Sequence, residues 1–289
     1  MTYEEVRRVE YDGELWDSTE SVPHPALLEL LRAEDVLVVL RHGGPPYAVV
    51  LGVPHQAAVG AEHICDKRVD PRGTADRRAS DENAASYALV AYSRLTDRRV
   101  PCKLVIMAHA TTHDPNKEVD TPYCREALSD ATLLLIECHG AGPHRRRSLE
   151  ISAGYCRLSD PERFGRALWE ALGGRCSLGV QKRVGRSEAL ILNARRQENE
   201  GVLEFAALRT CSLIAAAHDG IHALHLEARP EFRKPVDRSN SVTEQGLTLG
   251  SAIASAAADY LSHLEEESSG RAGCSDLLTR SGRGRRHPS

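Results

Sequence analysis

Short apolar runs alternate with helical patterns along most of the chain. Consecutive aliphatic residues predict strands that are buried on both faces, and apolar residues at helical spacing predict the helices between them. The predicted strands cover residues 35–40, 47–53, 103–108, 133–139, 148–152, 189–192 and 221–227, and the predicted helices cover 25–32, 80–95, 122–128, 161–172, 203–217 and 242–264. This alternation predicts an α/β fold: a single domain with a mostly parallel mixed sheet and helices on both faces.

The two ends of the chain do not follow this pattern. Residues 1–22 are polar and are expected to form a peripheral N-terminal segment, so the α/β domain is expected to span residues 23–264. Residues 265–289 are rich in Ser, Gly and Arg, a composition that predicts a disordered tail. Inside the domain, the polar stretch 66–79 is long for a connection, which indicates a functional or mobile loop.

Composition excludes several classes of partner. The 289 residues carry a net charge of −4, which gives no reason to expect nucleic acid, and the Arg-rich tail lacks the aromatic residues of a single-strand binder. No apolar run has transmembrane length, and the polar start is not that of a signal peptide. The 8 cysteines lack CxxC spacing and are expected to be reduced thiols in a cytoplasmic protein. The sequence leaves the oligomeric state open.

Polar residues, whose burial costs free energy, stand at the ends of predicted buried strands. Glu137 and His139 close one such strand and share a face, because side chains alternate along a strand, whereas Cys138 points to the other face. That alternation rules out a thiolate–imidazole couple between Cys138 and His139. Open α/β sheets bind ligands beyond the carboxyl ends of their strands, so His139 is a candidate ligand; a structural histidine that caps the strand is the alternative.

Other strand ends carry similar groups. They are His55, the acids Asp81 and Glu82, the histidines His109 and His113, and the pair His225 and Glu227. A catalytic zinc takes three His, Asp or Glu ligands and leaves a fourth position for water, and this set supplies two histidines and a carboxylate with a glutamate to spare as general base. The alternatives are structural: Asp81 and Glu82 as helix caps, and Glu227 in an ordinary ion pair.

Taken in order, five short motifs resemble those of the N-formylglutamate amidohydrolase family, which is related to the zinc carboxypeptidases. The resemblance covers roughly residues 36–235. The matching segments are Val53-Pro-His-Gln-Ala57, Ser80-Asp-Glu-Asn-Ala-Ala85, Asp114-Pro-Asn-Lys117, Leu135-Ile-Glu-Cys-His-Gly140 and Ile221-His-Ala-Leu-His-Leu-Glu227, with Arg233 following.

The resemblance implies a fold of the phosphorylase/hydrolase type, like that of the zinc carboxypeptidases, and one Zn²⁺ ion. It implies zinc ligands at His55, at Asp81 or Glu82, and at His139, with Glu227 as the catalytic base and proton shuttle. It also implies that Asp114, Asn116, Lys117 and Arg233 line the substrate side, where cationic groups would bind a carboxylate. Glu137 and His225 are then expected to be partners that orient these groups.

Two departures from the family pattern bear on the substrate and on the carboxylate ligand. Lys117 stands where arginine is usual and cannot form a planar bidentate fork. Glu137 stands where aspartate is common, and Glu62 is a further candidate for the carboxylate ligand. The predicted function is zinc-dependent hydrolysis of an N-formyl or N-acyl amide, or a similar C–N bond, in a small substrate with a carboxylate. The alternative is a non-catalytic relative that binds a carboxylated metabolite or a protein partner.

Overall fold

The computed structural model describes most of the chain. The described residues are 6–19, 21–60, 64–69, 75–78, 81–111, 114–116, 118, 120–130, 132–195, 197–204, 207–208 and 210–280. For residues 64–69, 75–78 and 268–280 the description covers the backbone only. Within these ranges, no helix combines the length and the apolar character that a membrane span needs.

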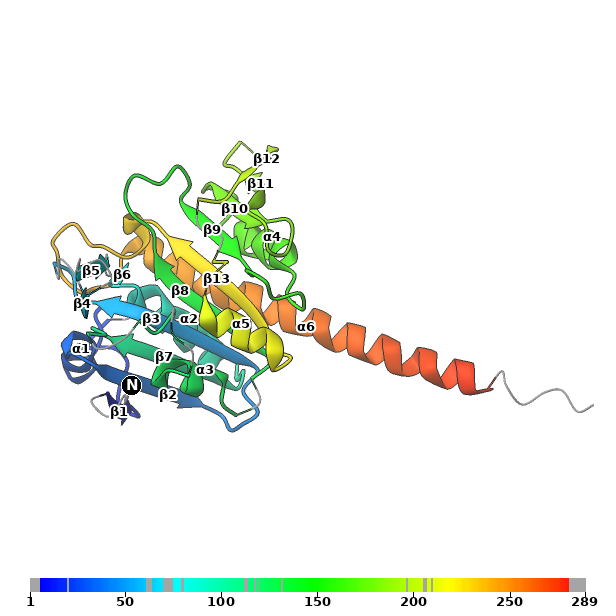
Figure 1. Ribbon diagram of the computed structural model, residues 1–289, viewed down its shortest axis with the longest axis horizontal. Helices are drawn as coiled ribbons and strands as arrows, with labels where there is room; N and C mark the ends of the chain where they lie inside the picture. Colours follow the sequence, from blue (N-terminus) through cyan, green and yellow to red (C-terminus); the bar gives the residue numbers. More distant parts are fainter. Residues whose placement is uncertain are drawn as a thin grey trace, which may run out of the picture.

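One large mixed sheet forms the centre of the molecule (Figure 1). Its strands, in spatial order, are β1 (Arg7–Glu10), β2 (Val36–His42), β7 (Cys102–Ala108), β3 (Val49–Ala57), β8 (Leu134–Gly140), β13 (His222–Ala228), β9 (Leu149–Ser152), β10 (Leu178–Gln181), β11 (Glu188–Leu192) and β12 (Glu198–Val202). A two-residue strand, β6 (Asp81–Glu82), pairs with the end of β3, and β4 (Ile64–Val69) pairs separately with β5 (Ala75–Arg78).

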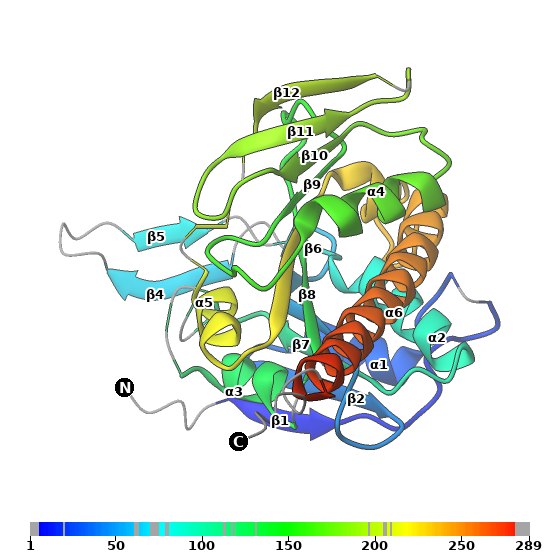
Figure 2. The ribbon, with the colours of Figure 1, turned by 90° about the vertical axis from the view of Figure 1, so that its right-hand side faces the viewer.

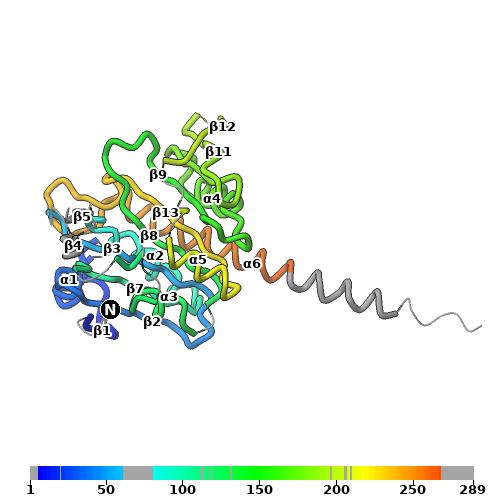
Figure 3. Tube along the Cα trace, in the orientation of Figure 1, coloured from blue at the N-terminus to red at the C-terminus, as the bar shows by residue number. Residues whose placement is uncertain are grey.

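The middle of the sheet is parallel. Strands β7, β3, β8 and β13 run in the same direction, and β8 and β13 lie side by side through the body of the molecule (Figure 3). Antiparallel pairs flank them on both sides, at β2–β7 and at β13–β9. The predicted α/β class with a mostly parallel mixed sheet is confirmed. Four carboxyl ends therefore meet at one edge of the sheet, where ligands bind in folds of this type.

Helices cover both faces of this sheet (Figure 2). On one face lie α2 (Ala85–Asp97), α4 (Pro161–Ala171) and α6 (Glu244–Arg280), and α6 packs against the other two. Helices α3 (Pro122–Leu128) and α5 (Cys211–His218) lie on the other face. Helix α1 (Pro25–Arg32) packs near β2, and the 3₁₀ helix η1 (Pro230–Phe232) follows β13.

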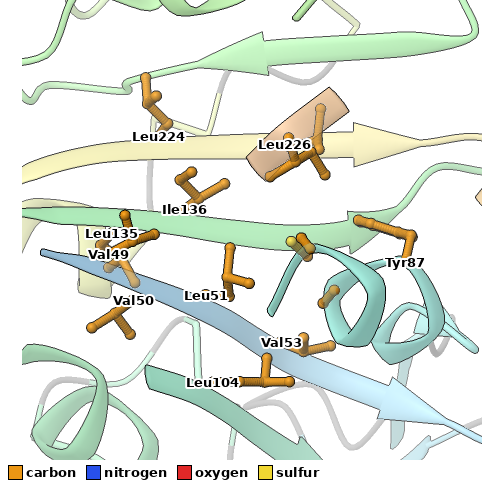
Figure 4. Close-up of a cluster of buried hydrophobic side chains, with 14 of the residues drawn as sticks. Val49, Val50, Leu51, Val53, Tyr87, Leu104, Leu135, Ile136, Leu224 and Leu226 are labelled. Atoms are coloured by element: carbon orange, nitrogen blue, oxygen red, sulfur yellow. The ribbon is translucent and has the colours of Figure 1, made fainter. Parts of the chain in front are cut away.

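The core forms where the central strands are sandwiched by these layers. Val49, Val50 and Leu51 are consecutive and all fully buried, because the sheet is covered on both sides. Figure 4 shows these side chains with those of Leu135, Ile136 and the neighbouring strands. The aliphatic runs that predicted these strands are thus the residues that attach both helical layers to the sheet.

Several expected boundaries differ from the structure. Asp81 and Glu82 were predicted to open a helix, but they form β6, and α2 begins at Ala85. The reason is tertiary: the buried side chain of Gln56 on β3 accepts a hydrogen bond from the Ala85 amide at 2.8 Å and so caps the helix from outside its own sequence. Helix α5 likewise starts at Cys211 rather than near residue 203.

The ends of the chain contain further elements. Within the segment 1–22, β1 forms the edge of the sheet, where it pairs in parallel with β2. Helix α6 continues to Arg280, beyond the expected end at residue 264; no proline interrupts this stretch.

Gly250 offers a test of how closely α2 and α6 pack. A Cβ atom at this position would lie 2.5 Å from Val90 Cβ and 2.6 Å from the Tyr87 carbonyl oxygen. Helix propensity alone predicts that Gly250→Ala stabilises the protein by ~1 kcal/mol, but the overlap with backbone predicts a loss of about 1–3 kcal/mol. Chemical denaturation should show the loss, with Gly44→Ala, where nothing lies within 4 Å, as the control. An increase in stability would show that α2 and α6 can move apart to accommodate the added methyl group without loss of packing.

Candidate metal centre

Three of the predicted metal ligands come together at the carboxyl edge of the sheet. His55 and His139 stand at the ends of β3 and β8, and Asp81 lies on β6 between them. One donor atom from each of the three lies within 4.8 Å of the others. Asp81 Oδ2 is 2.9 Å from His139 Nδ1 and 3.7 Å from His55 Nδ1, which brackets the ~3.3 Å expected between ligands of a tetrahedral zinc.

The far nitrogen of each imidazole has its own partner. His55 Nε2 lies 3.0 Å from Asp114 Oδ1, and His139 Nε2 lies 3.1 Å from the side-chain amide of Asn116. A carboxylate only accepts, so His55 donates from Nε2, and its Nδ1 lies on the side of Asp81. This is the arrangement that fixes the tautomer of a metal-ligating histidine.

Asn116 completes the same arrangement at His139. Its amide oxygen is buried and has no hydrogen-bond partner among the described residues, while its nitrogen faces His139 Nε2. A 180° rotation of the Asn116 side-chain amide brings its oxygen to His139 Nε2. The oxygen and nitrogen of a side-chain amide are told apart by their hydrogen-bond partners, which here favour the rotated form. His139 then donates from Nε2 to Asn116 and from Nδ1 to Asp81 Oδ2 at 2.9 Å, and a metal ion bound between the two residues would replace the Nδ1 proton.

Asp114 and Asn116 lie against the two histidines, and their expected place on the substrate side stays a prediction. The loop that carries them follows β7, which is the neighbour of β3, and this proximity brings Asp114 to His55. Of the other expected residues, Lys117 and Glu62 lie outside the described residues.

The two acids left open by the sequence have different surroundings. Asp81 contacts both histidines, whereas the Glu82 carboxylate forms an ion pair with Lys234 and is not part of the metal-ligating group. Neighbouring residues on a strand face opposite ways, so β6 can direct only one of the two acids to the histidines.

Arg233 is bonded to the backbone at the ends of the strands, and its expected place on the substrate side stays a prediction. Its buried guanidinium donates to three backbone carbonyls: to Ala228 at 3.2 Å, to Glu82 at 2.5 Å and to Ala141 at 2.9 Å. A Cβ atom on Gly140 would lie 2.6 Å from the Arg233 Cζ, so this glycine makes room for the guanidinium. Arg233 thereby ties β6 to the ends of β8 and β13.

A second polar group adjoins the first on the same face of the sheet. It consists of Glu137 and His139 on β8 and His225 and Glu227 on β13, all buried. Glu137, His139 and His225 also have donor atoms within 4.8 Å of one another. However, the rings of His139 and His225 are stacked, with centroids 4.1 Å apart and planes at 26°, so their in-plane lone pairs run side by side and do not converge on one ion.

Two residues that sequence reasoning missed fix this second group. Tyr123 on α3 and Ser212 on α5 donate to Glu137 Oε1 at 2.9 Å and 2.5 Å. One signal was available: Gly52, isolated within a strand, indicates close approach by another group. A Cβ atom there would lie 2.1 Å from the Tyr123 hydroxyl.

The site concentrates negative charge away from water. Four buried carboxylates, those of Asp81, Asp114, Glu137 and Glu227, lie among three imidazoles. Burial by itself would raise the pKa of the Asp81 carboxyl, but the contacts with His139 and His55 outweigh it and hold that pKa well below its ordinary value. The pKa of Glu137 is likewise lowered, against the effect of burial, by the imidazoles of His139 and His225.

The pKa of the His139 imidazole shifts in the opposite direction, upward. Burial would lower the pKa of its imidazole, but the hydrogen bond with Asp81 and the nearby carboxylate of Glu137 raise it to about 10. The carboxylates therefore favour a positive charge at His139, which a proton or a metal ion can supply. Because uncompensated buried carboxylates are costly, the donor set fits a divalent cation between His55, Asp81 and His139.

Comparisons with known proteins find similarity among solved structures only. No family model and no curated protein sequence matches the chain. Solved structures similar to it include an N-formylglutamate amidohydrolase from Ralstonia eutropha, with 8% identity over 80% of this chain and 98% of that one, at a TM-score of 0.48. A bacteriophage poly-gamma-glutamate hydrolase has 14% identity over 81% and 94% of the two chains, at a TM-score of 0.42.

A metallo-carboxypeptidase from Burkholderia cenocepacia is also similar, with 14% identity over 84% of this chain and 68% of that one, at a TM-score of 0.42. By their names, these three proteins are hydrolases.

Proposed function

We propose that this chain is a metal-dependent hydrolase of amide bonds, in which His55, Asp81 and His139 hold one zinc ion and Glu227 is the general base. One observation carries the proposal: two histidine Nδ1 atoms and a carboxylate oxygen converge at zinc-like spacing, while both Nε2 atoms are engaged by other partners. The ordered motifs of the sequence support the same residues.

Each residue has a definite task in this proposal. A zinc ion bound there would polarise the amide carbonyl and acidify an attacking water molecule. Glu227 lies directly across the strand pair from His139, so the base and a ligand are neighbours. Glu227 would accept the proton that the water loses and pass it to the leaving nitrogen, which restores the carboxylate for the next turnover.

The substrate follows from the motif resemblance. We propose an N-formyl or N-acyl amide, or a similar C–N bond, in a small molecule with a carboxylate. Lys117 is the cation proposed to bind that carboxylate, since the guanidinium of Arg233 is engaged by three backbone carbonyls. A panel of N-formyl and N-acetyl amino acids, with and without acidic side chains, tests this choice by release of the free amine.

Removal of a proposed ligand should abolish metal binding. His139→Ala leaves two ligands, and the purified protein is expected to fall from about one zinc per chain to none. Elemental analysis after dialysis measures this, and His218→Ala, on the exposed end of α5, is the matched control. A wild-type protein that binds no divalent metal, or a His139→Ala variant that keeps it, contradicts the proposal.

Asp114 should act through His55. The Asp114→Ala variant removes the acceptor that fixes the His55 tautomer, and the zinc affinity is expected to fall by about 10–100-fold without loss of the fold. Competition with a chromophoric chelator gives the dissociation constants of variant and wild type. Equal affinities would mean that Asp114 belongs to the substrate side after all.

Loss of the base should separate turnover from binding. Glu227→Gln is expected to bind zinc as the wild type does and to lower kcat by about 10²–10⁴-fold, because it cannot accept a proton. Steady-state kinetics on the best substrate of the panel give kcat, and Glu200→Gln on the exposed strand β12 is the control. Zinc binding with no hydrolysis by the wild type would instead identify a non-catalytic binding protein.

A further inference from the structure

The four polar residues of β8 and β13 form an alternating pattern on one face of the sheet. The strand register places Glu137 opposite His225 and His139 opposite Glu227. Each carboxylate therefore has an imidazole across the strand pair and another two residues along its own strand. Such a buried arrangement is stable only if every member is oriented by its neighbours.

Glu137 is the anchored member of this group. It is 0% exposed, and its Oε1 accepts hydrogen bonds from the hydroxyls of Tyr123 and Ser212, which belong to two different helices. Its other oxygen, Oε2, lies 3.8 Å from His139 Nε2 and 4.0 Å from His225 Nδ1. The carboxylate is thus fixed by groups outside the metal site, and it faces both imidazoles.

His225 connects this anchor to Glu227. Its ring is stacked on His139, its Nδ1 faces Glu137, and its Nε2 is 3.0 Å from Glu227 Oε1. The stacking and the hydrogen bond to Glu227 fix the plane of the ring and its rotation, and the negative charge of Glu137, 4.0 Å from Nδ1, favours the same orientation. Since an ionised carboxylate only accepts, His225 donates from Nε2 and occupies one oxygen of Glu227.

We infer that His225 is a positioning residue for Glu227, and that Glu137, fastened by Tyr123 and Ser212, sets the orientation of the His225 ring. The inference rests on the proposed role of Glu227 as the base. With Oε1 engaged by His225, only Oε2 is left to face the attacking water and to take its proton. A general base works only within hydrogen-bond reach of that proton, so an unfixed carboxylate loses turnover.

The decisive comparison is between two substitutions of His225. Leucine fills the space without a donor, and His225→Leu is expected to lower kcat by about 10²-fold with KM within about threefold and zinc content unchanged. Glutamine can donate from its side-chain amide, and His225→Gln is expected to recover about tenfold of that loss. His222→Gln, on the opposite face of β13, where His222 contacts Tyr260, is the matched control and should keep wild-type kcat.

Three results would overturn the inference: a wild-type kcat in His225→Leu, a glutamine variant no better than a folded leucine variant, or a loss confined to KM. If His225→Leu does not fold, the kcat of His225→Gln alone tests the inference. A kcat within about tenfold of wild type supports the inference, and a loss of 10²-fold or more overturns it.

Crystal structures of the zinc-loaded proteins test the inference without any substrate, and so separate it from the proposed function. The Glu227 carboxylate should keep its position in wild type and in His225→Gln and should lose it in His225→Leu. An unchanged Glu227 in His225→Leu would overturn the positioning role even if hydrolysis is established. Absence of hydrolysis by the wild type would refute the proposed function but would leave this structural result in place.

Discussion

The need to compensate buried carboxylates governs this end of the molecule. Asp81, Asp114, Glu137 and Glu227 are all withdrawn from water within one small region, at a cost that only hydrogen bonds and positive charge can offset. The imidazoles of His55, His139 and His225 lie between these carboxylates and connect them into one network. A divalent cation between two of the imidazoles and Asp81 would complete the compensation.

The surrounding fold makes this network rigid. Helices α3 and α5 contribute the hydroxyls that anchor Glu137, and α2 contributes the Tyr87 hydroxyl, which donates to the His139 carbonyl at 2.9 Å from the opposite face. Arg233 binds three backbone carbonyls at the ends of the strands. The layers that bury the hydrophobic core therefore also hold the polar groups at fixed positions, as a site for chemistry requires.

Much of this could be predicted from the sequence. Aliphatic runs identified the central strands because both faces of the sheet are covered, and the polar residues at their ends identified His55, His139 and Glu227 as candidates. Local patterns failed where a distant residue decides the outcome. Gln56 caps α2 and frees Asp81 to pair with β3, and no periodicity within 80–95 could reveal this.

What the sequence determined by itself was the alternation of elements and the set of residues with the right chemistry. The tertiary structure decided which of them meet: Asp81 rather than Glu82 at the histidines, Asp114 and Asn116 behind the imidazoles, and Arg233 within the backbone framework. The physical reason is that element type depends on neighbours in the chain, whereas partnership depends on strand order and register. Only the folded sheet brings β3, β6, β8 and β13 to one edge.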